Sequence, residues 1–228
     1  MDKTKVSGIS GNQLKIIAAI AMTIDHIGVM IFPDLDILRI IGRLALPIFA
    51  YMIAEGCRYT KNKKKYLLLL FAVAVLCQIV YFVTMSSLEQ SIMTTFLMSA
   101  LIIFSYEAAR KRKSFLNVFL FVLVFAAVFI VCEVLPEHIN GFSVDYGFWG
   151  VLAPFFVYLG RNRISKLLLL AVALLFLTLE IQWVQGYSFL ALIPLYFYNG
   201  TRGKWRMKYF FYIYYPLHLG VIHLISML

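Results

Sequence analysis

The chain has 228 residues, of which 62% are hydrophobic and only 14% are charged. This composition lies far outside the range of soluble globular domains, so it excludes a soluble enzyme or binding module and indicates a polytopic membrane protein. The formal net charge of +10 is explained by cationic loops on the cytoplasmic side of a membrane, and we therefore predict no nucleic-acid partner.

Apolar stretches of roughly 17 to 22 residues, the length that crosses about 30 Å of hydrocarbon, recur along the chain. They predict an all-α polytopic membrane protein of about nine transmembrane helices. Because no repeat or soluble segment interrupts the pattern, residues 1–228 are expected to form one transmembrane domain. The sixth and eighth spans are short and contain Pro154 and Pro194, which predicts broken, tilted or re-entrant helices. The expected spans are 14–33, 37–56, 66–85, 91–109, 115–135, 146–160, 165–184, 188–199 and 209–228.

The loops between these spans alternate in charge. Cations concentrate in the N-terminal segment, with Lys3, Lys5 and Lys15, and in "RYTKNKKK", "RKRK", "RNRISK" and "TRGKWRMK". The opposing loops "PDLD", "SSLEQ", "PEHINGFSVDYG" and "VQGYS" contain no Lys or Arg. Since Lys and Arg collect in cytoplasmic loops, the chain is expected to begin in the cytoplasm and to end on the outer side.

The first span contains two adjacent ionisable residues, Asp25 and His26, in "MTIDHIGVMIF". A helical rise of about 1.5 Å per residue places both near the membrane midplane, at a depth close to that of Arg43 in the second span. Adjacent helical residues point roughly 100° apart, so the two side chains are expected to have different partners. We predict that Asp25 pairs with an arginine and that His26 faces a cavity as a proton acceptor. An Asp25–Arg43 pair that only fixes helix register is the alternative.

The second span carries a polar face of its own. Arg39 and Arg43 lie one turn apart, and the same face continues to Pro47, which is expected to kink the helix. Glu55 lies about 18 Å further along the axis and is turned about 120° away from Arg43, so it is expected near the cytoplasmic mouth.

The last span, "KYFFYIYYPLHLGVIHL", is rich in hydroxyl and imidazole groups. An aromatic belt at the membrane interface does not explain Tyr214, Tyr215 and His218, which fall near the midplane. Tyr214 and His218 are one turn apart and are expected to share one polar face. His223 lies near the outer end and is expected to be interfacial.

Five segments, "LKIIAAIAMTIDHIG", "RIIGRLALPIFAYMIAEGCRYTKNKKKYL", "DYGFWGV", "NG" and "KYFFYIYYPLHL", together resemble the TraX family. That family is named after the F-plasmid protein that acetylates the pilin N-terminus, and it is similar to a wider group of transmembrane acyltransferases. The resemblance implies acetyl-CoA as donor and a membrane-embedded histidine in catalysis. The family motifs correspond here to Asp25, His26, Gly42, Arg43, Pro47, Glu55, Gly56, Thr60, Asp145, Tyr146, Gly147, Asn199, Tyr212, Pro216 and His218.

Acetyl transfer from a thioester needs a base and donors that stabilise an oxyanion, and it needs neither metal nor redox centre. The resemblance implies a catalytic set of His26 as base with Asp25 and Arg43, while Arg43 or a tyrosine of the last span stabilises the oxyanion. The expected substrate-binding residues are Arg39, Glu55, Asp145, Asn199, Tyr212, Tyr215 and His218. The expected contacts to coenzyme A phosphates are Arg58, Lys61, Arg202 and Lys208, in the cationic loops.

The expected function is therefore an acetyltransferase of the cell membrane that moves an acetyl group from cytosolic acetyl-CoA to an amine or hydroxyl. The acceptor is membrane-associated or extracytoplasmic, such as a protein N-terminus, a peptide or a glycan. Two alternatives stay open. A proton-coupled transporter also needs charges at the midplane, although such proteins usually show repeated halves. A non-catalytic pilus or envelope assembly factor would use the same charges for stability alone.

Overall fold

The computed structural model describes residues 8–85, 87–204 and 207–228, without the side chains of residues 84, 85, 208 and 209. Lys3, Lys5 and the side chain of Lys208 therefore lie outside the described residues.

The described residues form an all-α structure. Five segments are long and apolar enough to cross a membrane, and two shorter apolar helices accompany them. The expected all-α polytopic membrane fold is thus confirmed. The elements are α1 (Gly11–Met30), α2 (Asp36–Gly42), α3 (Ala45–Tyr59), α4 (Lys63–Met85), α5 (Ile92–Arg112), α6 (Phe115–Phe129), the π-helical η1 (Ile130–Val134), α7 (Leu135–His138), α8 (Gly147–Leu159), α9 (Arg163–Glu180), the 3-10 helical η2 (Trp183–Ala191), α10 (Leu192–Tyr196) and α11 (Lys208–Ser226).

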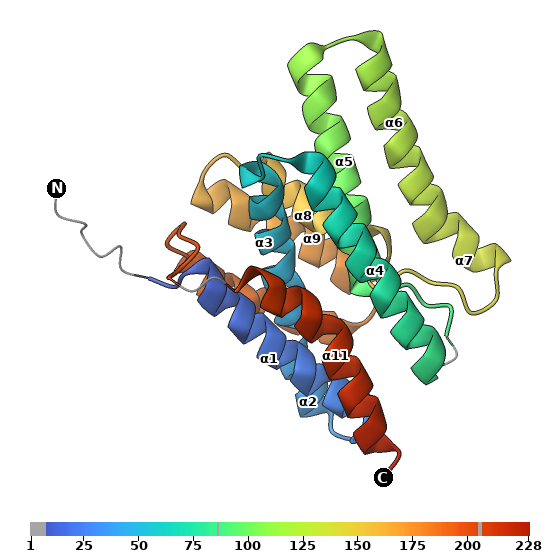
Figure 1. The fold of residues 1–228 in the computed structure, drawn as a ribbon. Coiled ribbons are helices and arrows are strands. Elements are labelled where there is room, and N and C mark those ends of the chain that lie inside the picture. The colour runs from blue at the N-terminus through green and yellow to red at the C-terminus, as the bar shows by residue number, and fades with distance from the viewer. Residues whose placement is uncertain (1–7, 86, 205–206) are drawn as a thin grey trace.

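Successive segments run in opposite directions between the two ends of the molecule (Figure 1). The pair α2–α3 returns from the end of α1, and α6, η1 and α7 together make one pass. Although η2 and α10 are short, they also make a full return, because the carbonyl of Tyr196 accepts a hydrogen bond from Arg163 at the start of α9 (3.1 Å). Over the described residues the chain passes between its ends nine times, as the sequence predicts.

The second expected span, 37–56, is present as the candidate span Asp36–Tyr59, and the disturbance expected at Pro47 takes the form of a break between two helices. α2 ends at Gly42 and α3 begins at Ala45. Pro47 supplies the physical reason: its ring lacks an N–H and clashes with the carbonyl four residues earlier, that of Arg43. The helix therefore restarts with Pro47 in its first turn, where no N–H is required.

The two proline-containing short spans behave differently from each other. α8 continues as one helix through Pro154, so the expected break is absent there. The eighth expected span, 188–199, instead begins at Trp183 and is mostly 3-10 helix before Pro194. A 3-10 helix rises about 2 Å per residue, so this short segment covers most of the distance that an α-helix would need more residues to cross.

α3 and α5 lie at the centre of the bundle, and α6 stands at its edge. Ile48 of α3 and Ile102 of α5 are fully buried, whereas α6 exposes most of its apolar side chains. Figure 1 shows α1 and α11 side by side at one flank of the bundle, with α4 next to α11. An exposed apolar helix is what a membrane-facing position requires.

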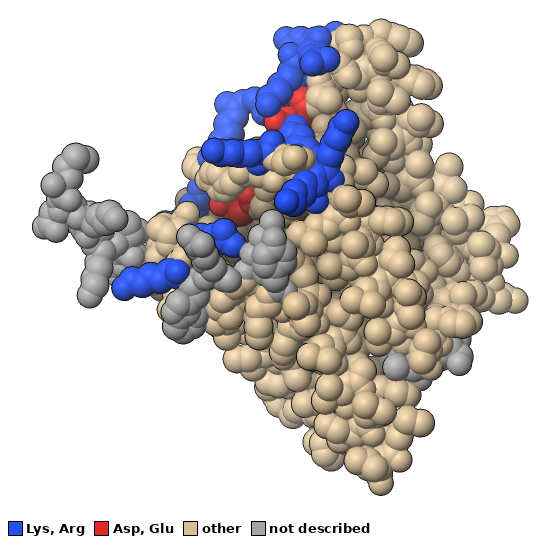
Figure 2. Space-filling model, viewed as in Figure 1, with Lys and Arg blue, Asp and Glu red and all other residues tan. Residues whose placement is uncertain are grey.

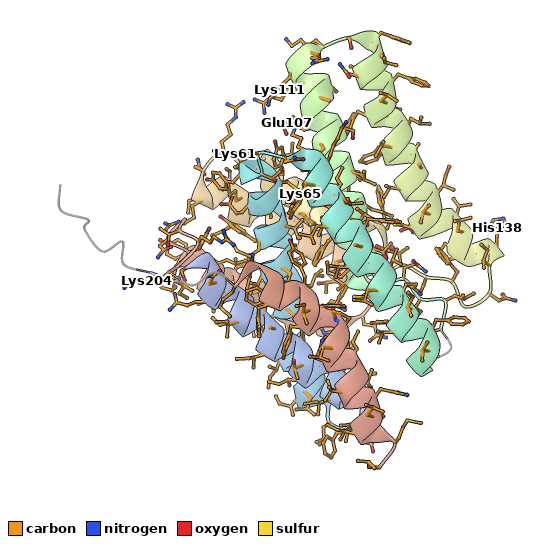
Figure 3. All side chains as sticks on the ribbon, viewed as in Figure 1. Lys61, Lys65, Glu107, Lys111, His138 and Lys204 are labelled. Atoms are coloured by element: carbon orange, nitrogen blue, oxygen red, sulfur yellow. The ribbon has the colours of Figure 1, made fainter. Side chains whose placement is uncertain are left out.

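Cationic side chains gather at one end of the molecule (Figure 2). Lys61, Lys65 and Lys111 lie at this end, and His138 lies across the molecule from them (Figure 3). Glu107 joins the cations by ion pairs to Lys63 (2.7 Å) and Lys111 (2.6 Å). We call this the inner end, since the charge distribution predicts that it faces the cytoplasm.

The topology is testable by cysteine labelling in intact cells, because the three native cysteines are buried. A cysteine at Lys64, at the inner end, should react with an impermeant maleimide only after the membrane is opened. A cysteine at Asn140, in the exposed loop before α8, should react at once. The reverse result would place the inner end outside the cell.

Candidate active site

A carboxylate held by two guanidinium groups joins α1 to α2. The oxygens of Asp25 accept hydrogen bonds from Arg39 (2.9 Å) and Arg43 (2.5 Å). Arg43 also donates through Nε to the carbonyl of Arg39 (3.1 Å), and its side chain is only 6% exposed. The predicted pairing of Asp25 with an arginine is therefore present, and Arg39 joins it because it lies one turn from Arg43.

Gly42 allows this pairing. A Cβ at that position would overlap the carboxyl group of Asp25. Only the hydrogen of a glycine leaves space for the carboxylate between α1 and the end of α2. The glycine between the two arginines is thus a requirement of close helix packing.

The two midplane histidines meet between α1 and α11. Nε2 of His218 lies 3.1 Å from Nδ1 of His26, and the ring centroids are 5.0 Å apart. Nδ1 of His26 also lies 2.9 Å from the carbonyl oxygen of Met22, and Nδ1 of His218 lies 3.0 Å from that of Tyr214. His26 and His218, which the sequence suggested separately, form one pair.

Hydrogen-bond partners assign the protons in the neutral pair. A carbonyl oxygen can only accept, so Nδ1 of His218 carries the proton that it donates to Tyr214. Nε2 of His218 is then an acceptor, and Nδ1–H of His26 is shared between it and the Met22 carbonyl. Nε2 of His26 is left with a lone pair, which no group within the described residues occupies. This nitrogen can accept a proton.

Tyr214 and Tyr215 hold the histidine pair in position. The Tyr214 ring stacks on His218 at 5.3 Å, and its hydroxyl lies 2.6 Å from that of Thr23 on α1. Tyr215 meets His218 edge-on at 5.4 Å. The predicted polar face of Tyr214 and His218 exists, and it is directed at α1.

Two cavities approach the histidine pair from opposite ends. The outer cavity, of about 690 Å³, is lined by His26, Asp25, Arg39 and Arg43, and it extends to Asp36 at the outer end of α1–α2. The inner cavity, of about 510 Å³, reaches the inner end. Three residues line both cavities and mark the boundary between them: Met22, Phe49 and Tyr215. We call these three residues the partition.

The outer cavity is rich in hydrogen-bond acceptors. Asp145 and Glu89 line it together with Gln185. Asp145 is fixed by its backbone, which accepts from Thr95 (2.8 Å) and donates to the carbonyl of Gln90 (3.0 Å). Burial raises the pKa of Asp145, in the outer loop, to about 7, and the charge of Arg43 opposes that rise. Asp145 can therefore gain or lose a proton near neutral pH.

The inner cavity changes in polarity along its length. Lys15 and Arg202 line its inner part, and neither has an ion-pair partner within the described residues. Glu55, also part of its wall, is held by Lys166 at 2.6 Å. Beyond these residues the wall becomes apolar up to the partition, through Ala19, Met52, Ile53, Met93 and Phe96.

Other predicted site residues have varied positions. Tyr212 lines the inner cavity, as Glu55 does. Arg58 donates to the carbonyls of Tyr158 (2.6 Å) and Gly160 (3.0 Å), and Lys61 is exposed at the inner end. Asn199 donates to Gly8 (3.3 Å) and accepts from Thr201. Their predicted substrate and phosphate contacts stay predictions, as does that of Lys208.

Sequence reasoning did not assign Thr23, Lys15 or Lys166 to the site. Lys15 and Lys166 were counted as topology charges, because a cation at a span boundary carries no further signal in sequence. Thr23 lies two residues before Asp25 and bonds Tyr214 on a helix almost 200 residues away (2.6 Å). Only the helix packing brings these partners together.

The model of the TraX protein family matches residues 10–226. The chain belongs to the TraX family. The matched range includes every residue of the histidine pair, the Asp25 ion pairs and the partition.

Among proteins similar to this TraX-family chain is the "Probable fimbrial assembly protein FimC, serogroup H1" of Dichelobacter nodosus, 28% identical over 93% of this chain and 94% of that protein. Another is the "Uncharacterized protein RP591" of Rickettsia prowazekii, 60% identical over 38 residues, which cover 17% of this chain and 15% of that protein. No solved structure matches the chain.

Removing the charge of Asp25 should destabilise the fold. Asp25→Asn leaves Arg43 buried without its counter-charge, a change that typically costs about 3–5 kcal/mol. The measurement is thermal unfolding of the purified full chain in detergent. Gly42→Ala should lower the unfolding temperature for the same reason, since its Cβ displaces the carboxylate.

Lys63→Gln is the control, because it breaks a half-exposed ion pair whose glutamate keeps Lys111. Exposed pairs typically contribute about 0–1 kcal/mol, so this variant should unfold close to the wild type. Equal stability of Asp25→Asn and Lys63→Gln would contradict the assigned role of the Asp25 pairs.

Proposed function

We propose that this TraX-family protein is a cell-membrane acetyltransferase. It takes an acetyl group from cytosolic acetyl-CoA in the inner cavity and transfers it to an amine or hydroxyl presented in the outer cavity. The observation that carries this proposal is the His26–His218 pair: His26 lines the outer cavity, and it lies one helical turn from Met22, which borders both cavities.

The chemistry uses the lone pair on Nε2 of His26. This nitrogen takes the proton of the acceptor N–H or O–H while the acceptor attacks the thioester carbonyl carbon. The new C–N or C–O bond forms, the oxyanion collapses, and the C–S bond breaks. His26 then gives its proton to the departing thiolate, which restores the neutral pair. His218 positions His26 through the 3.1 Å contact to Nδ1.

An oxyanion donor is available beside the pair. Tyr215 lines both cavities and contacts the His218 ring. Its hydroxyl can therefore donate a hydrogen bond to the oxyanion that forms at the boundary between the two cavities. Arg43 borders only the outer cavity and is already bonded to Asp25. These positions favour Tyr215 for the oxyanion, with Arg43 fixing the geometry of α1.

The inner cavity suits a donor that is charged at one end and apolar at the other. Lys15 and Arg202 can bind phosphate oxygens at the inner part by charge-assisted hydrogen bonds. The apolar wall between them and the partition can hold an extended, uncharged arm. From Lys15 to His26 the rise along α1 is about 16 Å, so the phosphates stay near the inner end while the thioester reaches the partition.

The acceptor stays open between a protein N-terminus, a peptide and a glycan. A pilus-related role is one form of this proposal, since the Dichelobacter nodosus relative carries the name of a fimbrial assembly protein. The alternative of a transporter has one observation in its favour, the two cavities that face opposite ends. A transporter would leave the thioester of acetyl-CoA intact, which separates it from the enzyme.

The base is tested by release of free coenzyme A from acetyl-CoA in liposomes containing the purified full chain, supplied with peptide and amino-sugar acceptors. His26→Ala should lower the rate by roughly 100-fold or more, the typical contribution of positioned proton transfer. His218→Ala should cost less, because His26 keeps its bond to Met22. His223→Ala, on the same helix but outside the pair, should keep wild-type turnover.

If His26→Ala turns over at the wild-type rate while His218→Ala does not, the base belongs to α11. If the wild type releases no free coenzyme A from acetyl-CoA, either with any of the acceptors or by hydrolysis, the enzyme proposal is wrong.

Donor binding is tested by substitution of the unpaired cations. Lys15→Gln or Arg202→Gln should raise the KM for acetyl-CoA by about ten-fold and leave kcat nearly unchanged. The variant loses a charged hydrogen bond to phosphate equally in the bound complex and in the transition state. Lys64→Gln, an equal change of charge on the exposed inner surface, is the control and should leave KM near the wild-type value. Equal KM values in all three variants would exclude this phosphate site.

A further inference from the structure

The partition is the only place where one set of described side chains borders both cavities. Met22 comes from α1, Phe49 from α3 and Tyr215 from α11. Met22 and Tyr215 are only 6% and 5% exposed, and Phe49 is half-buried. Three helices therefore each contribute one bulky side chain to the boundary.

The partition lies directly next to the proposed base. Met22 is one helical turn before His26, and its carbonyl oxygen lies 2.9 Å from Nδ1 of His26. Tyr215 packs edge-on against His218, 5.4 Å between ring centroids. A group that passes from the inner cavity to Nε2 of His26 has to pass these side chains.

Two polar contacts hold the α1–α11 side of the boundary. Thr23 and Tyr214 join α1 to α11 at 2.6 Å, and the histidine pair joins the same helices one turn further along at 3.1 Å. These two contacts keep Met22 and Tyr215 at a fixed separation. Moving Met22 away from Tyr215 would require both polar contacts to break in a membrane interior, where water offers little replacement.

We infer that the partition selects donors by the length of their acyl group, admitting acetyl and excluding longer chains. This inference rests on the proposed acetyltransferase function. Each extra methylene has to fit between Met22, Phe49 and Tyr215, which all lie on helices and not on a loop that could move aside. The head of the donor, bound by Lys15 and Arg202, stays the same for every acyl chain, so the selection falls on the partition alone.

The test compares turnover of acetyl-, propionyl- and butyryl-CoA by the full chain in liposomes, measured as release of free coenzyme A. Wild-type turnover should fall steeply with each added methylene, since one methylene in an apolar pocket typically changes selectivity by roughly 10- to 200-fold. Phe49→Ala and Met22→Ala should each raise the butyryl-to-acetyl ratio of kcat/KM by about ten-fold or more. If an alanine variant does not fold, Phe49→Leu and Met22→Val should shift the ratio in the same direction by a smaller factor.

Met52→Ala is the matched control. Met52 also lies on α3 and lines the inner cavity, but it does not border the outer one. Its removal enlarges the donor cavity away from the partition, so the butyryl-to-acetyl ratio should stay near the wild-type value.

The possible results distinguish failure of the acyl-chain selection from failure of the proposed acetyltransferase function. If the wild type transfers acetyl but the partition variants keep its ratio, or Met52→Ala shifts the ratio equally, the partition does not select the acyl chain and the enzyme stands. If the wild type uses none of the three donors, the proposed function fails and the inference fails with it.

Discussion

The packing of α1 against α2 and α3 depends on one carboxylate that is largely withdrawn from the surface, its side chain only 13% exposed. Asp25 lies inside a segment long and apolar enough to span a membrane, where an unpaired charge is expensive, so it requires both Arg39 and Arg43. Those arginines reach it because Gly42 leaves room for the carboxylate and because Pro47 ends α2 after Gly42. The helix break, the glycine and the ion pairs are thus one unit. Since His26 follows Asp25 directly, the same unit fixes where the proposed base lies.

The two cavities fit the division between donor and acceptor that the proposed acetyltransferase reaction requires. Carrying a whole acetyl-CoA molecule across the bilayer would take several phosphate charges through hydrocarbon, whereas an acetyl group is small and uncharged. Lys15 and Arg202, the two cations of the inner cavity, lie at the inner end, and carboxylates such as Glu89 and Asp145 line the outer cavity. In the proposed reaction only the acyl group then has to pass the partition, and the charged groups of donor and acceptor stay near opposite ends.

The sequence predicted the features that depend on the helical period and on the depth of a residue in the membrane. The counter-charge for Asp25, the separate partners of Asp25 and His26, the shared face of Tyr214 and His218, and the disturbance caused by Pro47 all follow from spacing along single helices. The contact between His26 and His218 did not follow, because it depends on how α1 and α11 tilt and rotate against each other. The Glu55–Lys166 pair was not predicted either, because a lysine at the end of a span cannot be distinguished in sequence from a topology charge.

The contacts around the partition also bear on the choice between an enzyme and a transporter. Alternating access requires one group of helices to rock against another around a central site. Here the two helices that flank the site, α1 and α11, are joined at two successive turns by Thr23–Tyr214 and His26–His218. Rocking of α1 against α11 would break both contacts and leave their polar groups without partners in the membrane interior, which is unfavourable. Acyl transfer needs no such movement. A fixed boundary with a proton acceptor on one side is therefore better suited to passing a small acyl group than to moving a solute through.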